Sequence, residues 1–164
     1  MLARLERVLV AANRAALGLM MLTMTALVFA NVVTRYGFGF SIAWVEEVSL
    51  YLMVWIAYLG AGLALREGRH VAIELAQDRL PSAAVPWVRA VVGLAVLTFL
   101  ACVALLGLRF ALFAMDQETP VLNIPLGIPY LAIPVGAAVF ALHFVLVFRD
   151  YVARRLTLPE ATER

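Results

Sequence analysis

Four long apolar runs constrain this chain more than any other feature of its sequence. They cover approximately residues 15–33, 44–65, 87–113 and 128–148. About 20 apolar residues in a helix cross the ~30 Å hydrocarbon core of a bilayer. Only 15% of the residues are charged and 65% are hydrophobic, whereas ~25% of the residues in soluble domains are charged. The sequence therefore predicts an all-α integral membrane protein, with four transmembrane helices in a single domain over residues 1–164.

The arginines determine the expected orientation of these helices. All 13 basic residues are arginines, and only Arg35 and Arg109 fall in the first and third connections between the runs. The other eleven lie before the first run, between the second and third, or after the fourth: Arg4, Arg7, Arg14, Arg66, Arg69, Arg79, Arg89, Arg149, Arg154, Arg155 and Arg164. Because cytoplasmic segments are enriched in Arg and Lys, both termini are expected in the cytoplasm. The first and third connections are short, so an external ligand-binding domain would have to be another polypeptide.

Two short segments have amphipathic patterns. Residues 1–14 and residues 71–80 each place apolar side chains at helical spacing among charged ones. Each segment is expected to form a short helix in the membrane interface, with a frayed terminus as the alternative for the first. The first apolar run exceeds the 7–15-residue core of a cleavable signal, so we expect it to be retained as a helix.

The start of the second apolar run carries a candidate contact surface. Ser41 is expected to cap the second helix, which places Glu46 and Glu47 in its first turns, where the helix dipole favours anions. Arg35 is close enough in sequence to pair with one of the two carboxylates. Adjacent carboxylates at the end of a membrane helix are costly, so these residues and Trp44 form a candidate assembly site. The alternative is an ordinary helix start with an aromatic belt.

Other residues in and near the runs are expected to serve packing. Gly60 and Gly62 form a small-residue face that permits close approach of another helix. Asn31 is expected to form an interhelical hydrogen bond, with a ligand contact as the alternative. The proline-dense segment 114–128 is expected to be a rigid, irregular connection, and Pro134 either lies in the first turn of the fourth helix or kinks it.

The sequence lacks the patterns of most catalytic and cofactor sites. It contains no phosphate-binding loop, nucleophile constellation or metal-ligand cluster, and its net charge of +2 is too small to indicate a nucleic-acid partner. Cys102 is alone, so no intrachain disulfide is possible. A membrane anchor of a redox enzyme would need paired haem ligands, whereas His70 and His143 each stand alone. A dimeric small multidrug-type exporter would need a carboxylate deep in a span. We expect no cofactor and no enzymatic activity, and we keep the exporter and the redox anchor as alternatives.

The order of several short motifs resembles a known family. The residues concerned are Arg35, Tyr36, Phe38, Ser41, Trp44, Glu46, Glu47, Trp55, Gly60, Arg66 and His70, followed by the run from Pro120 to Pro125, Tyr130, and the run from Ile133 to Gly136. Together they resemble the small membrane subunit of tripartite ATP-independent periplasmic (TRAP) transporters, the DctQ-like family. The resemblance covers about residues 15–150.

This resemblance implies a function that depends on partners. It implies a bacterial inner-membrane subunit that braces the scaffold of a large permease subunit. The complex would take up an organic acid with sodium, after delivery by a periplasmic solute-binding protein. The candidate subunit-interface residues are Arg35, Tyr36, Trp44, Glu46, Glu47, Gly60, Gly62, Arg66 and His70.

Overall fold

The computed structural model describes residues 2–66 and 84–152, and most of these residues are helical. The long helices are α1 (Leu2–Gly37), α2 (Ala43–Arg66), α4 (Val85–Phe113) and α6 (Ala132–Val152). The 3₁₀ turn η1 (Ala114–Asp116) and the short helix α5 (Gly127–Tyr130) lie between α4 and α6. No β-strand forms in the described ranges, although Glu118 and Pro125 make an isolated antiparallel bridge.

Four helical segments are long and apolar enough to cross a membrane, as predicted. They are Glu6–Gly37, Ala43–Ala64, Val85–Asp116 and Gly127–Phe148. Between 6% and 39% of the residues in their most apolar windows are buried inside the chain. Most apolar side chains of the spans therefore face outward, toward lipid or a partner protein.

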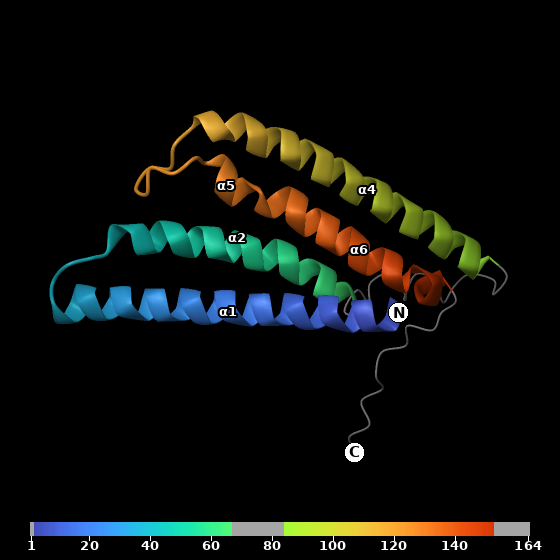
Figure 1. The fold of residues 1–164 in the computed structure, drawn as a ribbon, viewed down its shortest axis with the longest axis horizontal. Coiled ribbons are helices and arrows are strands. Elements are labelled where there is room, and N and C mark those ends of the chain that lie inside the picture. The colour runs from blue at the N-terminus through green and yellow to red at the C-terminus, as the bar shows by residue number, and fades with distance from the viewer. Residues whose placement is uncertain (1, 67–83, 153–164) are drawn as a thin grey trace, which may run out of the picture.

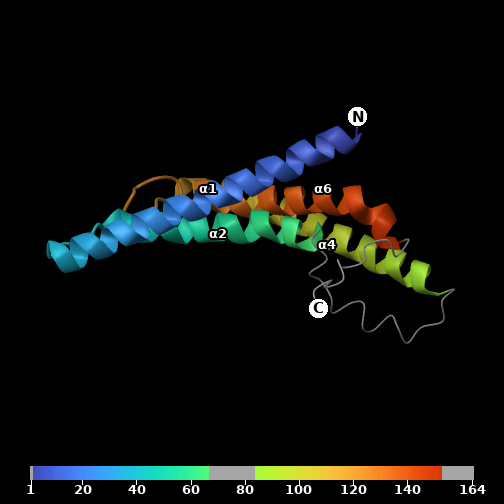
Figure 2. The same ribbon diagram turned by 90° about the horizontal axis from the view of Figure 1, so that it is seen from below.

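The four long helices lie side by side in one layer, in the order α1, α2, α6, α4 (Figure 1). α1 packs on α2, α2 on α6, and α6 on α4, and α1 is inclined across the layer (Figure 2). Successive helices run in opposite directions. The turn 38–42 and the segment 117–126 therefore lie at the same end of the layer, which we call the loop end (Figure 1). α1 begins and α6 finishes at the opposite end, as an even number of spans requires. The side that faces the cytoplasm remains a prediction.

Glycines permit the close approach of α2 and α6 at the centre of the layer. A Cβ atom at Gly62 would lie 2.9 Å from Cα of Phe140, and one at Gly136 would overlap the side chain of Tyr58. Close approach through small residues is a common mode of helix association in membranes, where there is no hydrophobic drive between helices. The expected small-residue face of α2 is therefore used within the chain itself.

The structure alters the expectations for two other segments. Residues 2–14 do not form a separate interfacial helix, because they continue into the first span as α1. No proline or glycine occurs before Gly18 to interrupt the helix. Pro134 is the third residue of α6 and so lies in its first turn. Backbone N–H groups in the first turn have no acceptor within the helix, so a proline there costs no hydrogen bond. The helix expected over 71–80 lies outside the described residues.

Candidate functional site

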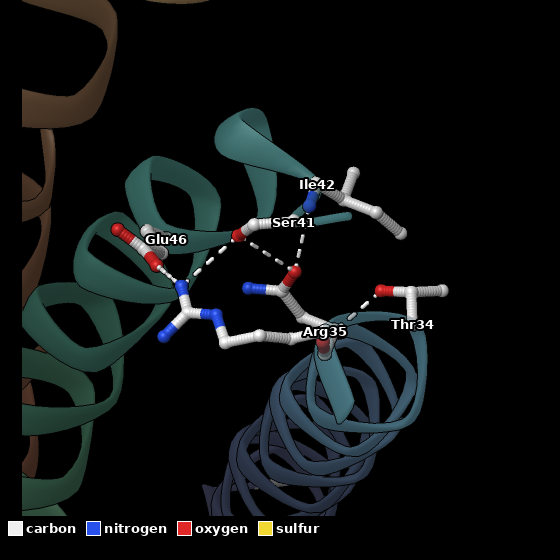
Figure 3. A network of polar contacts seen from close by, with 6 residues as sticks. Thr34, Arg35, Ser41, Ile42 and Glu46 are labelled. Atoms are coloured by element: carbon white, nitrogen blue, oxygen red, sulfur yellow. Dashed lines mark hydrogen bonds and ion pairs between the residues drawn. The ribbon is translucent and has the colours of Figure 1, made fainter. Parts of the chain in front are cut away.

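A polar network joins the end of α1 to the start of α2 at the loop end (Figure 3). The buried side chain of Asn31 accepts hydrogen bonds through Oδ1 from Ile42 N–H (2.7 Å) and the Ser41 hydroxyl (3.3 Å). The Ser41 oxygen in turn accepts from Arg35 Nη2 at 3.0 Å. The same nitrogen lies 2.6 Å from Oε1 of Glu46. The network ties the α1–α2 turn to both helices, and Asn31 bonds to residues of this turn rather than to a residue of another helix.

The local reason for this turn lies at the end of α1. The N–H groups of Phe38 and Phe40 both donate to the carbonyl of Thr34, at 3.1 and 3.3 Å. Gly39 has φ +77°, a left-handed conformation that glycine adopts without steric cost. The chain can therefore reverse within a few residues, which brings Glu46 back to Arg35.

Ser41 does not cap α2, contrary to the prediction. α2 begins at Ala43, and Val45 N–H donates to the carbonyl of Ile42 at 3.1 Å, which makes Ile42 the residue that precedes the helix. The N–H of Ile42 is instead satisfied by Asn31, a residue of the preceding helix. The Asn31 side chain thus holds the residue before α2 through that residue's N–H, and the Ser41 side chain bonds to Asn31 and Arg35 rather than to an N–H of α2.

Glu46 and Glu47 lie in the first turns of α2, as predicted, but they serve different segments. Glu46 pairs with Arg35 in an exposed ion pair, with side chains 65% and 50% exposed. Pairs this exposed contribute ~0–1 kcal/mol to stability. The pair therefore does little for the fold, and it leaves both charges accessible at the surface.

Glu47 instead holds the segment 117–126. Its Oε1 accepts from the Tyr51 hydroxyl at 2.8 Å. Its Oε2 accepts from two successive backbone N–H groups, those of Val121 (2.9 Å) and Leu122 (3.2 Å). Charge-assisted hydrogen bonds of this kind are stronger than neutral ones. Sequence reasoning missed this contact because 74 residues separate Glu47 from Val121.

Internal hydrogen bonds also close the segment 117–126. Thr119 N–H donates to the Ile124 carbonyl at 2.9 Å, and Leu126 N–H donates to the Gln117 carbonyl at 2.8 Å. The Thr119 side chain is buried, and its oxygen accepts from Ile124 N–H at 3.2 Å. The expected irregular connection is thus a closed loop, and Glu47 binds its tip.

We predict that Glu47→Ala will free the tip of this loop. Two backbone N–H groups lose their acceptor, so amide hydrogen exchange over 120–123 should accelerate by about ten-fold or more. Exchange measured by mass spectrometry on the purified protein checks this. Glu46→Ala is the matched control, since Glu46 makes no contact with the loop, and it should leave exchange there unchanged. Equal acceleration in both variants would show that Glu47 does not anchor the loop.

Exposed aromatic side chains surround this cluster. They are Tyr36, Phe38, Phe40 and Trp44. Aromatic residues concentrate where a membrane protein passes through the lipid headgroup region. The loop end therefore has the composition of a membrane–water interface.

The remaining predicted interface residues lie farther along α2 or beyond it. Gly60 faces Leu17 of α1, with 3.9 Å from a Cβ built at Gly60 to Cδ2 of Leu17. Gly62 is buried against α6, so the chain's own helix occupies the space predicted for a partner. Arg66 is the last residue of α2, and His70 lies outside the described residues. The structure thus gathers Arg35, Tyr36, Trp44, Glu46 and Glu47 at the loop end and places Gly60, Gly62 and Arg66 in the other half of α2.

A second polar contact, between Asn13 and His143, lies inside the layer. Asn13 Nδ2 of α1 donates to the Leu59 carbonyl of α2 at 3.1 Å and lies 3.3 Å from Nε2 of His143 on α6. His143 is fully buried, and Asn13 is 8% exposed. Sequence reasoning missed Asn13, although an asparagine on an otherwise apolar helix face is a usable signal. The contact links three helices, and the described residues contain no group of three or more His, Cys, Asp or Glu that could hold a metal ion.

The comparison with protein families decides the class of the chain. Residues 24–154 match the family described as "Tripartite ATP-independent periplasmic transporters, DctQ component".

The chain belongs to the DctQ family.

Members of this family are membrane subunits of transporters and not enzymes, and with four spanning helices this chain is a multi-pass membrane protein. The family assignment confirms the resemblance found in the sequence and leaves no support for the exporter or the redox anchor.

Curated relatives agree with the family. A putative TRAP transporter small permease protein of Haemophilus influenzae is 50% identical over 58 residues, 35% of this chain and 36% of the relative. The C4-dicarboxylate TRAP transporter small permease protein DctQ of Rhodobacter capsulatus is 32% identical over 126 residues, 74% of this chain and 54% of the relative. The ectoine TRAP transporter small permease protein TeaB of Halomonas elongata is 27% identical over 131 residues, 79% of this chain and 68% of the relative. The chain thus spans about half, or less, of the length of the first two.

Proposed function

We propose that this chain is the small permease subunit of a TRAP transporter in a bacterial inner membrane. In this proposal it braces a large permease subunit during the sodium-driven uptake of an organic acid, which a periplasmic binding protein delivers. The observation that carries the proposal is the single layer of helices. At most 39% of the residues in any span's apolar window are buried inside the chain, so the layer has extensive apolar surface that a large membrane partner can cover. Exposed apolar surface of this extent is typical of interaction sites.

In one relative, a DctQ-like segment is part of a longer permease protein, which supports a large permease as the partner of this chain. The isethionate TRAP transporter permease protein DctMQ of Oleidesulfovibrio alaskensis is 28% identical over 106 residues, which make up only 16% of its length. A DctQ-like segment there forms part of a much longer permease protein. We infer that this chain serves a larger permease in the same way, as a separate subunit.

The class of solute is inferred from the names of the relatives. They include two small permease proteins described as C4-dicarboxylate proteins and the isethionate protein. These solutes are organic anions, and an organic acid is therefore the class that we propose for the complete transporter.

Within this function, we propose the loop end as the assembly surface. It offers Trp44, Tyr36 and the exposed Arg35–Glu46 pair, together with the loop that Glu47 holds. An exposed ion pair contributes little to stability. When a partner covers the pair, removal of one member leaves the other charge buried and unpaired, which weakens the assembly strongly. Arg66, the last residue of α2, remains a candidate contact, and so does His70, which lies outside the described residues.

Two measurements test this proposal. They are co-purification with the large subunit, and solute uptake by cells that express this chain, the large subunit and the binding protein. We predict that Glu46→Gln or Glu47→Gln, or the double variant, will lower co-purification or uptake by about five-fold or more, since stranding a buried charge costs several kcal/mol. Membrane insertion should be unchanged. Glu6→Gln, the same substitution near the start of α1 at the opposite end of the layer, is the control. The isolated chain in vesicles should transport no organic acid. Sodium-driven uptake by the chain alone would contradict the bracing role, and an unaffected double variant would remove the carboxylates from the assembly surface.

A further inference from the structure

A groove of about 380 Å³ lies between α1 and α2 at the loop end. Its apolar lining comes from Val28 and Val32 of α1 and from Val45 of α2. Its polar lining includes Arg35, Glu46 and Ser49. The two charged residues of the groove thus lie toward the α1–α2 turn, whereas Val28 and Val32 lie deeper along α1, beside the uncharged polar side chains of Asn31 and Ser49.

The position of the groove matches the depth of lipid headgroups. Tyr36 also lines it, and Phe38 and Trp44 lie at the same end of the layer. Such aromatic side chains mark the membrane interface. From Arg35 to Val28 the helix descends about 10 Å, at ~1.5 Å per residue, which is enough to pass from the headgroups to the first acyl carbons. α1 is the edge helix of the layer (Figure 1), so lipid can reach the groove.

Several polar groups of the groove have unused hydrogen-bonding capacity. Within the described residues, the Ser49 hydroxyl oxygen is buried and has no partner. Arg35 directs a single nitrogen, Nη2, to both Ser41 and Glu46, and only Oε1 of Glu46 takes part in their ion pair. Buried polar atoms are nearly always hydrogen bonded. The Ser49 residue lines the groove, and rotation about its χ1 angle would turn the orphaned hydroxyl toward a ligand there.

We propose that this groove binds a zwitterionic phospholipid with a primary amine in its headgroup. The phosphate binds the free nitrogens of Arg35, and the ammonium group donates to the free oxygen of Glu46. The Ser49 hydroxyl donates to an ester carbonyl of the lipid, and the first acyl carbons lie against the valines.

Charge complementarity favours this lipid over others. The groove presents one positive and one negative group 2.6 Å apart, which matches a phosphate beside an ammonium. A purely anionic headgroup would place its charge near Glu46, and a choline headgroup has no N–H to donate. Arg35, Tyr36 and Glu46 line the groove and also belong to the proposed assembly surface, so the bound lipid lies between them and the partner protein. Trp44 and the loop 117–126 do not line the groove and contact the partner directly.

Native mass spectrometry of the full chain tests the proposal, after release from nanodiscs that contain equal parts of phosphatidylethanolamine, phosphatidylglycerol and phosphatidylcholine. Phosphatidylethanolamine should be retained about five-fold over each of the other two, the ratio expected from one or two additional hydrogen bonds. Ser49→Leu, which removes the hydroxyl that faces an ester carbonyl common to all three lipids and narrows the groove, should lower the retention of all three by about five-fold. Glu46→Gln should erase the preference over phosphatidylcholine. The matched control is Thr98→Leu, because Thr98 is an exposed hydroxyl residue of α4 whose oxygen bonds only its own helix.

Three results would overturn the proposal. Equal retention of the three lipids by the parent would show adventitious lipid only. Unchanged total retention in Ser49→Leu together with unchanged preference in Glu46→Gln would place the lipid elsewhere, and the Glu46 variant decides this even if Ser49→Leu fails to fold. The large subunit could also displace the lipid when it binds, and fail to co-purify with the Ser49→Leu variant. This result would show that a protein helix occupies the groove. The readout requires no transport, so its failure is distinct from that of the proposed function.

Discussion

Gly136→Leu is expected to separate α6 from α2 and to lower the free energy of unfolding by at least about 3 kcal/mol. A Cβ atom at this position would overlap Cβ of Tyr58, and it would lie 3.0 Å from the carbonyl carbon and 3.2 Å from Cα of the same residue. Backbone atoms cannot rotate away as a flexible side chain can, so the helices must move apart. α6 also packs on α4, and a shift of α6 would disturb the centre of the layer.

Gly18→Leu is the matched control for this substitution. Gly18 also lies in a long helix, but no atom lies within 4 Å of a Cβ built there. Both variants gain the same helix propensity of ~1 kcal/mol on loss of a glycine, so their difference isolates the packing. Equilibrium unfolding in mixed micelles measures it. Gly62→Leu should resemble Gly136→Leu, because its Cβ would approach Phe140 Cα at 2.9 Å. Stability equal to that of Gly18→Leu would mean that α2 and α6 do not approach so closely.

His143→Leu is expected to cost about 1–3 kcal/mol, the second largest effect that we predict. His143 is fully buried, and its Nε2 lies 3.3 Å from the amide nitrogen of Asn13, 130 residues away in sequence. Leucine removes this partner and leaves the Asn13 amide with the Leu59 carbonyl alone. Little water is available inside a bilayer to replace the lost hydrogen bond.

A double-mutant cycle separates this contact from other effects of the substitution. Asn13→Leu and the double variant complete the cycle, with a coupling of about 0.5–2 kcal/mol expected between the two positions. Asn31→Leu is the control partner, because Asn31 is a buried asparagine of the same helix at the loop end. Its effect should add to that of His143→Leu. A coupling near zero for Asn13 and His143 would show that they do not interact.

The helices themselves could be predicted from local sequence. Three of the four spans agree with the expected ranges to within three residues, and the first is longer because it begins at Glu6 and continues to Gly37. Inside a bilayer each backbone polar group must be satisfied within the chain, so an apolar run of sufficient length has few alternatives to a helix. The position of Glu46 and Glu47 in the first turns of α2, and the pairing of Arg35 with one of them, were predictable for a similar reason. These residues are separated only by a short turn.

The division of roles between the two carboxylates could not be predicted. Glu46 binds Arg35 across 11 residues, whereas Glu47 binds two N–H groups of a loop 74 residues away. Nothing in the local pattern distinguishes the neighbours. They differ because successive helical side chains point about 100° apart, so that they face different elements of the layer.

The sequence by itself determined which segments span the membrane, and family motifs determined the class of the protein. Only the tertiary structure decided that Asn31 binds the N–H of the residue before α2, that Gly62 faces α6 while Gly60 faces α1, and that Asn13 contacts His143. Helix formation is local, since each hydrogen bond joins residues four apart. The order and rotation of the helices depend on which small and polar side chains fit together across the layer, and those side chains are far apart in the sequence.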